Sequence, residues 1–352
     1  MSRTAALLRA TSVRFTSLYF LPFYAALSAA GQARWEWVVM GAGYWFAHSV
    51  GTETLNRLAD RREDEVNRPE RTALCQHAGW ENIRRAAVWS WVAVAVLDLA
   101  FLAMRPDPVL ALFLVLGGLS SVNYSYGLRL SRNRFAAPFV LTFHFCGTFV
   151  IGWTLAQDHW STEVWKGFAE YPLPFFAVGF LTLLVLGGAK DLTDLAGDVS
   201  IGYHSAWVGV VRRHGSAVTT AMVWSTYVMV GLLVAVGLFP PRFLFWLLLL
   251  PVATALGRCL WRASSEQERS ATREFFYQYW VLNLAVAVPL YSPHLSTVVG
   301  VVGGLAFWVF TTQRVHWSPG VRRGTLRALV SLVGRGPRPD PHPIPTMEGK
   351  AR

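Results

Sequence analysis

Oxygen-bearing side chains recur every fourth residue at the end of a long apolar run. Asn56, Asp60 and Asp64 follow the apolar run 35–55 and precede Pro69. On a helix, this spacing places the three side chains along one stripe, one turn apart. Carboxylate and amide oxygens suit a hard cation such as Mg²⁺, which also takes water and phosphate ligands. A proline disfavours helical geometry in the residue before it, so we expect the helix to end near Pro69. Residues 56–64, the first acidic motif, are therefore a candidate magnesium site.

A second acidic motif, residues 190–198, follows another apolar run about half a chain later. Asp191, Asp194 and Asp198 are spaced i, i+3, i+7 and share one helical face. Lys190 precedes them in a chain with only three lysines. Either motif alone could be a solvated helix end. The matched pair favours one shared site that both motifs build.

The elements that must position these motifs are membrane helices. The chain is 53% hydrophobic and only 15% charged, whereas soluble domains carry about 25% charged residues. Runs of about 20 apolar residues, long enough to cross a bilayer, recur along the chain. We expect an all-α, polytopic membrane bundle of nine to ten transmembrane helices. The predicted spans are 15–30, 35–55, 83–104, 108–125, 136–157, 172–189, 216–238, 242–261, 275–292 and 296–312.

Arginine-rich loops set the predicted orientation. Several arginines follow each even-numbered span, whereas most of the intervening loops hold single basic residues. Because basic loops stay in the cytoplasm, both acidic motifs are predicted on the cytoplasmic side. The net charge of +11 then reflects loops that face anionic lipid, and we expect no nucleic-acid partner. Three scattered cysteines indicate neither a disulfide framework nor a zinc site.

The two ends of the chain differ in character. The run 15–30 follows three arginines and resembles a cleavable signal peptide, but its proline and aromatic residues favour a first membrane helix that lies partly in the interface. We expect one transmembrane domain over residues 1–315. Residues 316–352 are predicted to form a basic, proline-rich, disordered cytoplasmic tail.

Two carboxylate clusters that face each other across a cytoplasmic cleft could bind a diphosphate. Metal ions would bridge the carboxylates to the phosphate oxygens and neutralise the charge that develops as diphosphate leaves. Basic side chains near the motifs would assist, and these are Arg68, Lys190, Arg71 and Arg129. The apolar helices would surround an isoprenoid tail, which a water-soluble nucleotide lacks.

These motifs resemble those of the UbiA superfamily of intramembrane prenyltransferases. The first family motif, N-D-x-x-D-x-x-x-D followed by N-R-P, is similar to Asn56, Asp60, Asp64 and Asn67-Arg68-Pro69. The second, K-D-x-x-D-x-x-G-D, is similar to Lys190, Asp191, Asp194, Gly197 and Asp198. A Tyr-Ser loop is matched by Asn123-Tyr124-Ser125, with Arg129 beyond it. Arg57 departs from the first motif, where many members carry aspartate. It would either weaken one metal position or contact phosphate directly.

The resemblance implies a helical bundle around a lipid-open central cavity, usually with nine spans. Mg²⁺ would bind at Asn56, Asp60, Asp64, Asp194 and Asp198. It would hold the diphosphate of an allylic isoprenyl donor, so that Asp60 and Asp194 serve catalysis. Arg68, Arg71, Lys190, Tyr124 and Arg129 would contact substrate, and Asp191 would orient or deprotonate the acceptor. The implied partners are an isoprenyl diphosphate, a small hydrophobic acceptor or none, and membrane lipid.

The residues leave three functions open. Prenyl transfer to an aromatic or quinone-like acceptor is the leading hypothesis. Terpene cyclisation without an acceptor suits the same fold. A cation-coupled transporter would place its acids near span centres, whereas these acids lie at the cytoplasmic ends. His48 is expected to be a core residue, and His144 is either a core residue or part of the cavity lining.

Overall fold

The computed structural model describes residues 2–31, 33–157, 161–200, 210–211, 216–317 and 319–334. In chain order, the described elements are α1 (Arg3–Ala10), η1 (Val13–Phe15), α2 (Thr16–Ala29), α3 (Trp35–Ala59), α4 (Arg61–Asn67), α5 (Pro69–Ala78), α6 (Trp80–Met104), α7 (Pro108–Ser125), η2 (Leu130–Arg132), α8 (Ala136–Ala156), α9 (Thr162–Glu170), α10 (Pro172–Ser200), α12 (Ser216–Ala235), η3 (Pro241–Leu249), α13 (Leu250–Arg262), α14 (Glu266–Tyr291), α15 (Leu295–Thr311), η4 (Thr312–His316) and α16 (Pro319–Gly334).

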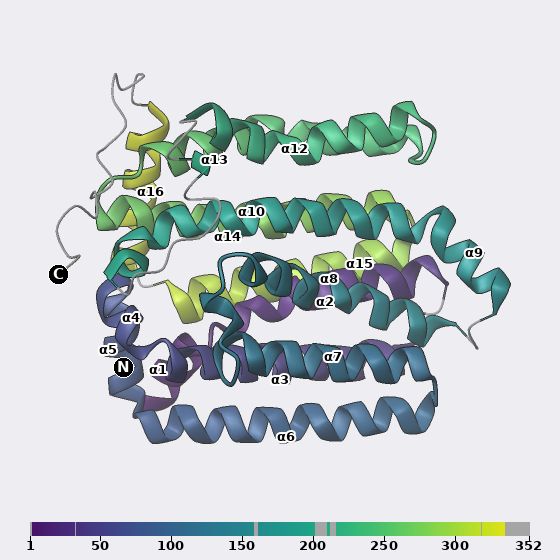
Figure 1. The fold of residues 1–352 in the computed structure, drawn as a ribbon, viewed down its shortest axis with the longest axis horizontal. Helices are drawn as coiled ribbons and strands as arrows, with labels where there is room; N and C mark the ends of the chain where they lie inside the picture. The colour runs from purple at the N-terminus through teal and green to yellow at the C-terminus, as the bar shows by residue number, and fades with distance from the viewer. Residues whose placement is uncertain are drawn as a thin grey trace.

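The long helices run side by side as a bundle (Figure 1). Seven described segments are long and apolar enough to cross a membrane, and they lie in α6, α7, α8, α10, α12, η3–α13 and α15–η4. The helices α2, α3 and α14 pack beside them. No strand occurs in the ranges given above. The predicted all-α membrane bundle is therefore confirmed, while the count of nine to ten spans stays a prediction.

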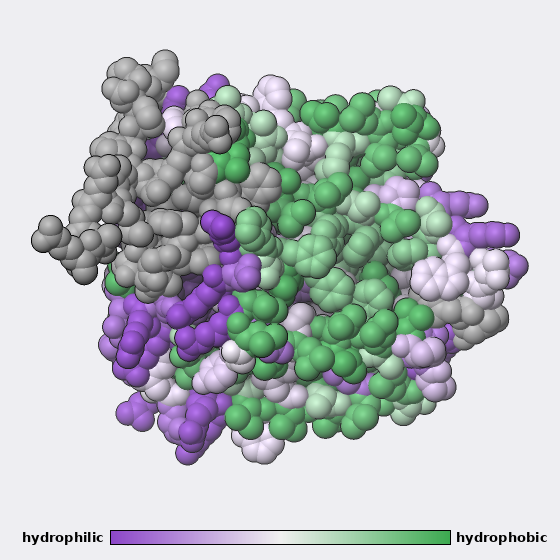
Figure 2. All heavy atoms as spheres, viewed as in Figure 1, coloured by the Kyte–Doolittle hydropathy of each residue, from purple (hydrophilic) through white to green (hydrophobic). Residues whose placement is uncertain are grey.

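The surface matches a membrane environment. Figure 2 shows an apolar band across the middle of the bundle, with hydrophilic side chains gathered at the end that carries α4 and α5. On α6, large apolar side chains such as Val88, Trp89 and Leu99 are exposed. An exposed apolar band of this extent indicates contact with lipid.

Helix α2 lies in the centre of the bundle, packed against α3, α8, α14 and α15. Small residues on its neighbours permit this close approach. A Cβ atom on Gly152 of α8 would overlap the carbonyl oxygen of Phe23, and one on Gly304 of α15 would lie 2.8 Å from Leu21 Cδ2. The predicted partly interfacial position of residues 15–30 was wrong, because most α2 side chains are buried in the core.

Short helices gather at the polar end of the bundle, where α1 packs against α5 (Figure 1). Residues 319–334, predicted as part of a disordered tail, instead form α16 against α13 and α14. Ser265 and Glu268 form a reciprocal capping box that starts α14 at this end. Residues 335–352 lie outside the described residues, so the rest of the tail prediction stays a prediction.

Candidate active site

A cavity of about 190 Å³ lies where the first acidic motif meets α8, α10 and α14. Its lining joins two kinds of surface. Charged and polar side chains from the α3–α5 segment lie at one side, and aromatic side chains from α2, α8 and α14 line the rest. The predicted site residues that line it are Asn56, Asp60, Asp64, Arg68, Arg71, Tyr124 and Asp191.

The first acidic motif spans a helix junction. Helix α3 ends at Ala59, and Asp60 has φ −97° and ψ 22° before α4 begins. Backbone hydrogen bonds nevertheless continue at helical spacing, from Asp60 N to Asn56 O at 2.9 Å and from Asp64 N to Asp60 O at 2.8 Å. The predicted single helix is thus interrupted at Asp60, yet all three motif side chains reach the same cavity.

Arg57 is enclosed by hydrogen bonds and ion pairs. Its side chain is 2% exposed, pairs with Glu53, and has Nη1 3.3 Å from Asp64 Oδ2. Its Nε donates to the carbonyl oxygen of Ala10 at 3.2 Å. A buried guanidinium stabilises neighbouring carboxylates only while those contacts stay intact. Arg57 therefore acts as a fixed cation inside the first acidic motif.

Asp64 lies between two guanidinium groups, because Arg71 Nη1 is also 3.6 Å from its Oδ1. Burial, together with repulsion from Arg57 and Arg68, lowers the pKa of Arg71 to about 10. A ligand that brings negative charge would relieve this repulsion. Arg68 and Arg71 both line the cavity, as predicted, and this environment favours an anion there.

Asp60 is the carboxylate of this region that is costly to ionise. Burial, together with the nearby carboxylates of Glu63 and Asp64, raises its pKa to about 6 against the opposing effect of Arg57. Asn56 Oδ1 accepts a hydrogen bond from Ser125 Oγ at 3.0 Å, which orients the amide. A cation beside Asp60 would lower the electrostatic cost of its charge.

These residues fit a magnesium ion in chemistry. Thr52 Oγ1 and Glu63 Oε2 are buried in the cavity lining, and neither has a hydrogen-bond partner in the described part of the chain. Together with Asp60 and Asn56 they offer hard oxygen donors, which Mg²⁺ prefers. Across the described residues, no cluster of three acidic, histidine or cysteine side chains is close enough to form a complete metal site by itself.

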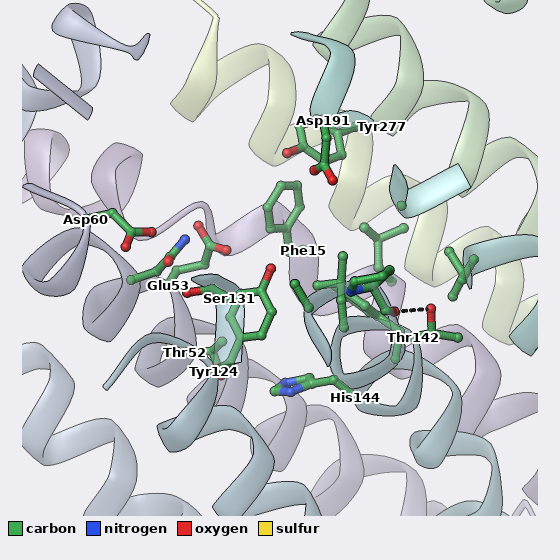
Figure 3. A pocket seen from close by; sticks show the side chains of 18 of the residues that line it. Phe15, Thr52, Glu53, Asp60, Tyr124, Ser131, Thr142, His144, Asp191 and Tyr277 are labelled. Atoms are coloured by element: carbon green, nitrogen blue, oxygen red, sulfur yellow. Dashed lines mark hydrogen bonds between the residues drawn. The ribbon is translucent and has the colours of Figure 1, made fainter. Parts of the chain in front are cut away.

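The second acidic motif supplies Asp191. Figure 3 shows Asp191 beside Tyr277, with Phe15 between them and the Asp60 side of the cavity. The side chains of Lys190, Asp194 and Asp198 lie outside the described residues. The predicted roles of these three residues stay predictions.

The loop after α7 presents a different arginine from the predicted one. Arg129 is exposed, has a left-handed backbone with φ 49°, and does not line the cavity. Arg132 lines the cavity and pairs with Glu63 of α4. Gly127 is also left-handed, with φ 55°, so two successive turns decide which side chain of the loop reaches the site.

The aromatic part of the cavity continues into a second, smaller one of about 60 Å³. The two cavities share Leu18, Phe145, Leu183 and Trp280 in their linings. The Phe145 ring packs edge-on against Trp280 at a centroid distance of 4.4 Å. Aromatic faces stabilise positive charge, so this interior suits an apolar group that becomes cationic.

Several lining residues were missed from the sequence, namely Thr52, Glu53, Ser131, Arg132, Phe276, Tyr277 and Trp280. The helical spacing could have found two of them. Thr52 precedes Asn56 by one turn, and Glu53 precedes Arg57 by the same step. The α14 aromatics carried no motif that separates them from other core residues.

Fold and cavity together define a helical membrane protein with a site of two parts. Side chains of α3–α5 form its charged mouth, and rings such as Phe145 and Trp280 form its aromatic interior. The model of the UbiA prenyltransferase family matches residues 17–282, so the chain belongs to this family. No curated protein sequence matches the chain.

Two solved structures are similar in fold. One is a UbiA homolog from Archaeoglobus fulgidus bound to GPP and Mg²⁺, with a TM-score of 0.55 and 13% identity over 82% of this chain and 99% of that one. The other comes from work on digeranylgeranylglyceryl phosphate synthase in membranes, with a TM-score of 0.54 and 13% identity over 84% of this chain and 100% of that one. At this identity they show the fold alone.

Proposed function

We propose that this protein ionises an allylic isoprenyl diphosphate and transfers the prenyl group to a small, aromatic or quinone-like acceptor. The observation that carries the proposal is the composition of the cavity beside the first acidic motif. Acidic and arginine side chains of its mouth suit Mg²⁺ and diphosphate, while its aromatic interior suits an isoprenoid chain. The solved UbiA homolog binds GPP and Mg²⁺, which supports the same substrate class here.

Each side of the mouth has a role in the proposal. Asn56, Asp60 and Asp64, with Asp194 and Asp198, would hold Mg²⁺, which supplies positive charge to a leaving diphosphate. Arg68, Arg71 and Lys190 bind phosphate oxygens by charge-assisted hydrogen bonds. Tyr124 contacts the substrate from the α7 end. We place this mouth on the cytoplasmic side of the membrane.

The interior acts on the hydrocarbon. As the C–O bond to diphosphate breaks, positive charge develops on the allylic carbon. Rings such as Phe145 and Trp280 would stabilise this charge through their π faces, and the apolar surroundings limit the access of water. Asp191, at the boundary of mouth and interior, orients the acceptor or takes the proton of its hydroxyl group.

Cyclisation of the donor itself is a second candidate. The observation that favours it is the aromatic lining that runs from the first cavity into the second. Such a lining could hold a folded chain while its own double bonds capture the cation. The two functions differ only in which π electrons attack.

One experiment separates these functions. Protein purified in detergent would be incubated with Mg²⁺ and geranyl, farnesyl or geranylgeranyl diphosphate, with and without aromatic acceptors, while released diphosphate and extracted products are measured. Product that requires an acceptor supports transfer, and cyclic hydrocarbon without acceptor supports cyclisation. Asp60→Ala and Asp191→Ala should abolish release.

The matched control is Glu65→Ala, which removes an exposed carboxylate of α4 that does not line the cavity. It should leave release unchanged. An absence of release and of diphosphate binding under every condition would contradict both enzymatic proposals.

A further inference from the structure

Three polar side chains from three helices meet at the apolar side of the cavity. Ser121 Oγ of α7 lies 3.1 Å from His48 Nε2 of α3, and it lies 2.9 Å from Nδ1 and 3.0 Å from Nε2 of His144 of α8. All three side chains are buried. His144 lines the cavity (Figure 3), whereas His48 is not among its lining residues.

The hydrogen-bond network fixes the direction of the bonds. The hydroxyl of Ser121 donates to the carbonyl oxygen of Gly117 at 2.6 Å. A serine hydroxyl has one proton, so its lone pairs are left to accept N–H bonds from the two imidazoles. Each neutral imidazole then keeps one ring nitrogen as an acceptor. For His48 this atom is Nδ1, which is buried and has no partner among the described residues.

Aromatic rings surround the two histidines. The Tyr19 ring centroid lies 5.4 Å from both imidazoles, and those of Trp45 and Trp91 lie 5.3 and 5.5 Å from His48. The imidazole centroids are 4.8 Å apart. Such rings favour a nearby cation, so they stabilise an imidazolium at His144 without a carboxylate in contact.

One acid of a neighbouring helix reaches this cluster through another side chain. Tyr44, whose ring stacks on His48 at 5.8 Å, hydrogen-bonds to Asp98 of α6. Asp60 follows the end of α3, and Asp64 lies in α4. The His48–Ser121–His144 cluster is therefore a polar site separate from the charged mouth.

We propose that His144 accepts the proton that the reaction releases in the interior, with Ser121 and His48 as positioning residues. The inference rests on the proposed function. The C–O bond of the donor breaks and its electron pair leaves with diphosphate. π electrons of the acceptor, or of the chain itself, then form the new C–C bond and leave a cationic carbon.

The neighbouring C–H bond supplies the last step. Its proton passes to the ring nitrogen of His144 that carries no hydrogen, and its electron pair forms a C=C bond, which in an aromatic acceptor restores the ring. Ser121 accepts a hydrogen bond from the imidazole and holds it toward the cavity, and His48 donates to the same hydroxyl. The imidazolium returns its proton to water when the product leaves.

The test compares His144→Asn with wild type under the assay above. Asparagine keeps a polar group for Ser121 but cannot take the proton. General base catalysis contributes about 10²-fold or more, so the deprotonated product should fall by roughly that factor. Diphosphate release should stay within about threefold, because ionisation precedes the proton transfer. Water would capture the cation instead, so prenyl or terpene alcohol should increase.

Two further variants keep the test decisive. Ser121→Ala retains both imidazoles but releases their orientation, so it should shift the same product ratio by a smaller factor. Thr148→Val is the matched control, because Thr148 lies one turn after His144 on α8, donates to Phe145 O of its own helix and is not among the residues that line either cavity. It should leave the ratio unchanged.

The outcomes separate the two proposals. Normal diphosphate release with an unchanged product ratio in both His144→Asn and Ser121→Ala would overturn the role of His144 alone. No diphosphate release by wild-type protein from any donor would overturn the proposed function, and the role of His144 with it. A purely structural role would lower release and product together and would leave their ratio constant, which also counts against the proposal.

Discussion

Buried polar groups are stabilised in different ways at the mouth of the cavity and in its interior. At the mouth, Arg57 and Arg71 pair with Asp64, so charge is balanced by opposite charge. In the interior, Ser121 joins two histidines by neutral hydrogen bonds among aromatic rings. Burying a charge costs several kcal/mol unless it is paired, whereas a neutral group needs only a hydrogen bond.

This difference indicates which part of the reaction each region can serve. The mouth keeps a surplus of costly charge at Asp60 and Arg71, whose pKa values are shifted toward neutrality, and it gains stability from a charged ligand. The interior is lined by rings such as Phe145 and Trp280, so it suits a cation that exists only during the reaction. Changes in charge should therefore damage the mouth, and changes in shape should damage the interior.

The largest effect is expected from removal of the buried cation of the mouth. Arg57→Met keeps the side-chain length but leaves Glu53 and Asp64 without their partner. Breaking a buried pair in this way costs about 3–5 kcal/mol. Denaturant unfolding in detergent should show this loss, and adding Glu53→Gln should recover part of it.

Arg61→Met is the control for this prediction. Arg61 and Glu65 form an exposed pair at 3.8 Å, with both side chains 51% exposed, and exposed pairs contribute about 0–1 kcal/mol. Similar losses for Arg57→Met and Arg61→Met would mean that the mouth is not a paired, desolvated network.

The packing of central α2, which contributes Leu18 to both cavities, should instead respond to one methyl group. In Gly152→Ala, the new Cβ would overlap the carbonyl oxygen of Phe23, which belongs to the backbone of central α2. Overpacking of this kind costs about 1–3 kcal/mol, and the shift of α2 should reduce turnover as well. Thermal unfolding and the diphosphate-release assay would measure both effects.

Gly147→Ala on the same helix is the matched control, because its Cβ would meet only the Phe143 ring at 4.0 Å. Replacement of glycine within a helix should then be neutral or stabilising by up to about 1 kcal/mol. If Gly152→Ala and Gly147→Ala lost equal stability, the close approach of α2 to Gly152 would not explain the effect.

Asp60→Asn tests the surplus charge of the mouth through pH. The pKa of Asp60 is raised from 3.8 to about 6 by burial, Glu63 and Asp64. A raised pKa means that the folded state binds the proton more tightly, so this contribution is fully present below about pH 4 and is lost as pH rises through about 6. The variant should therefore stabilise metal-free protein at pH 7.5 by about 1–2 kcal/mol, which allows for solvent screening.

Unfolding in EDTA at pH 7.5 and pH 4 would measure this difference, which should nearly vanish at pH 4. Addition of Mg²⁺ at pH 7.5 should stabilise wild type more than the variant. If the difference in unfolding free energy between wild type and variant did not change with pH, ionisation of Asp60 would not destabilise the folded protein.

The sequence located the helices better than their junctions. Apolar runs predicted α6, α7 and α8 closely, because a span must contain about 20 apolar residues. The interruption at Asp60 has no proline or glycine at the break to signal it. The central position of α2 depends on glycines of α8 and α15 that lie more than a hundred residues away, and no local pattern reports such pairing.

For the site, the sequence predicted the residues that a motif fixes and missed those that a turn or a neighbouring helix brings in. Asn56, Asp60 and Asp191 reach one cavity from motifs far apart in the chain. Arg132 replaces Arg129 because the loop turns twice in left-handed conformations, and only one of those turns is marked by glycine.

The comparison of Arg132 with Arg129 gives the smallest predicted effect, and it tests which residues of this loop belong to the mouth. Arg132→Ala removes a guanidinium that lines the cavity and pairs with Glu63. A hydrogen bond to a charged group contributes about 1.5–3 kcal/mol. Because the Arg132 guanidinium also pairs with Glu63, we expect an effect at the lower end of this range, so affinity for inorganic diphosphate with Mg²⁺ should fall about tenfold. Arg129→Ala should change it less than twofold, since that side chain is exposed and away from the cavity. Calorimetric titration of both variants would measure the two effects, and the reverse order would place the diphosphate on the outer side of the loop.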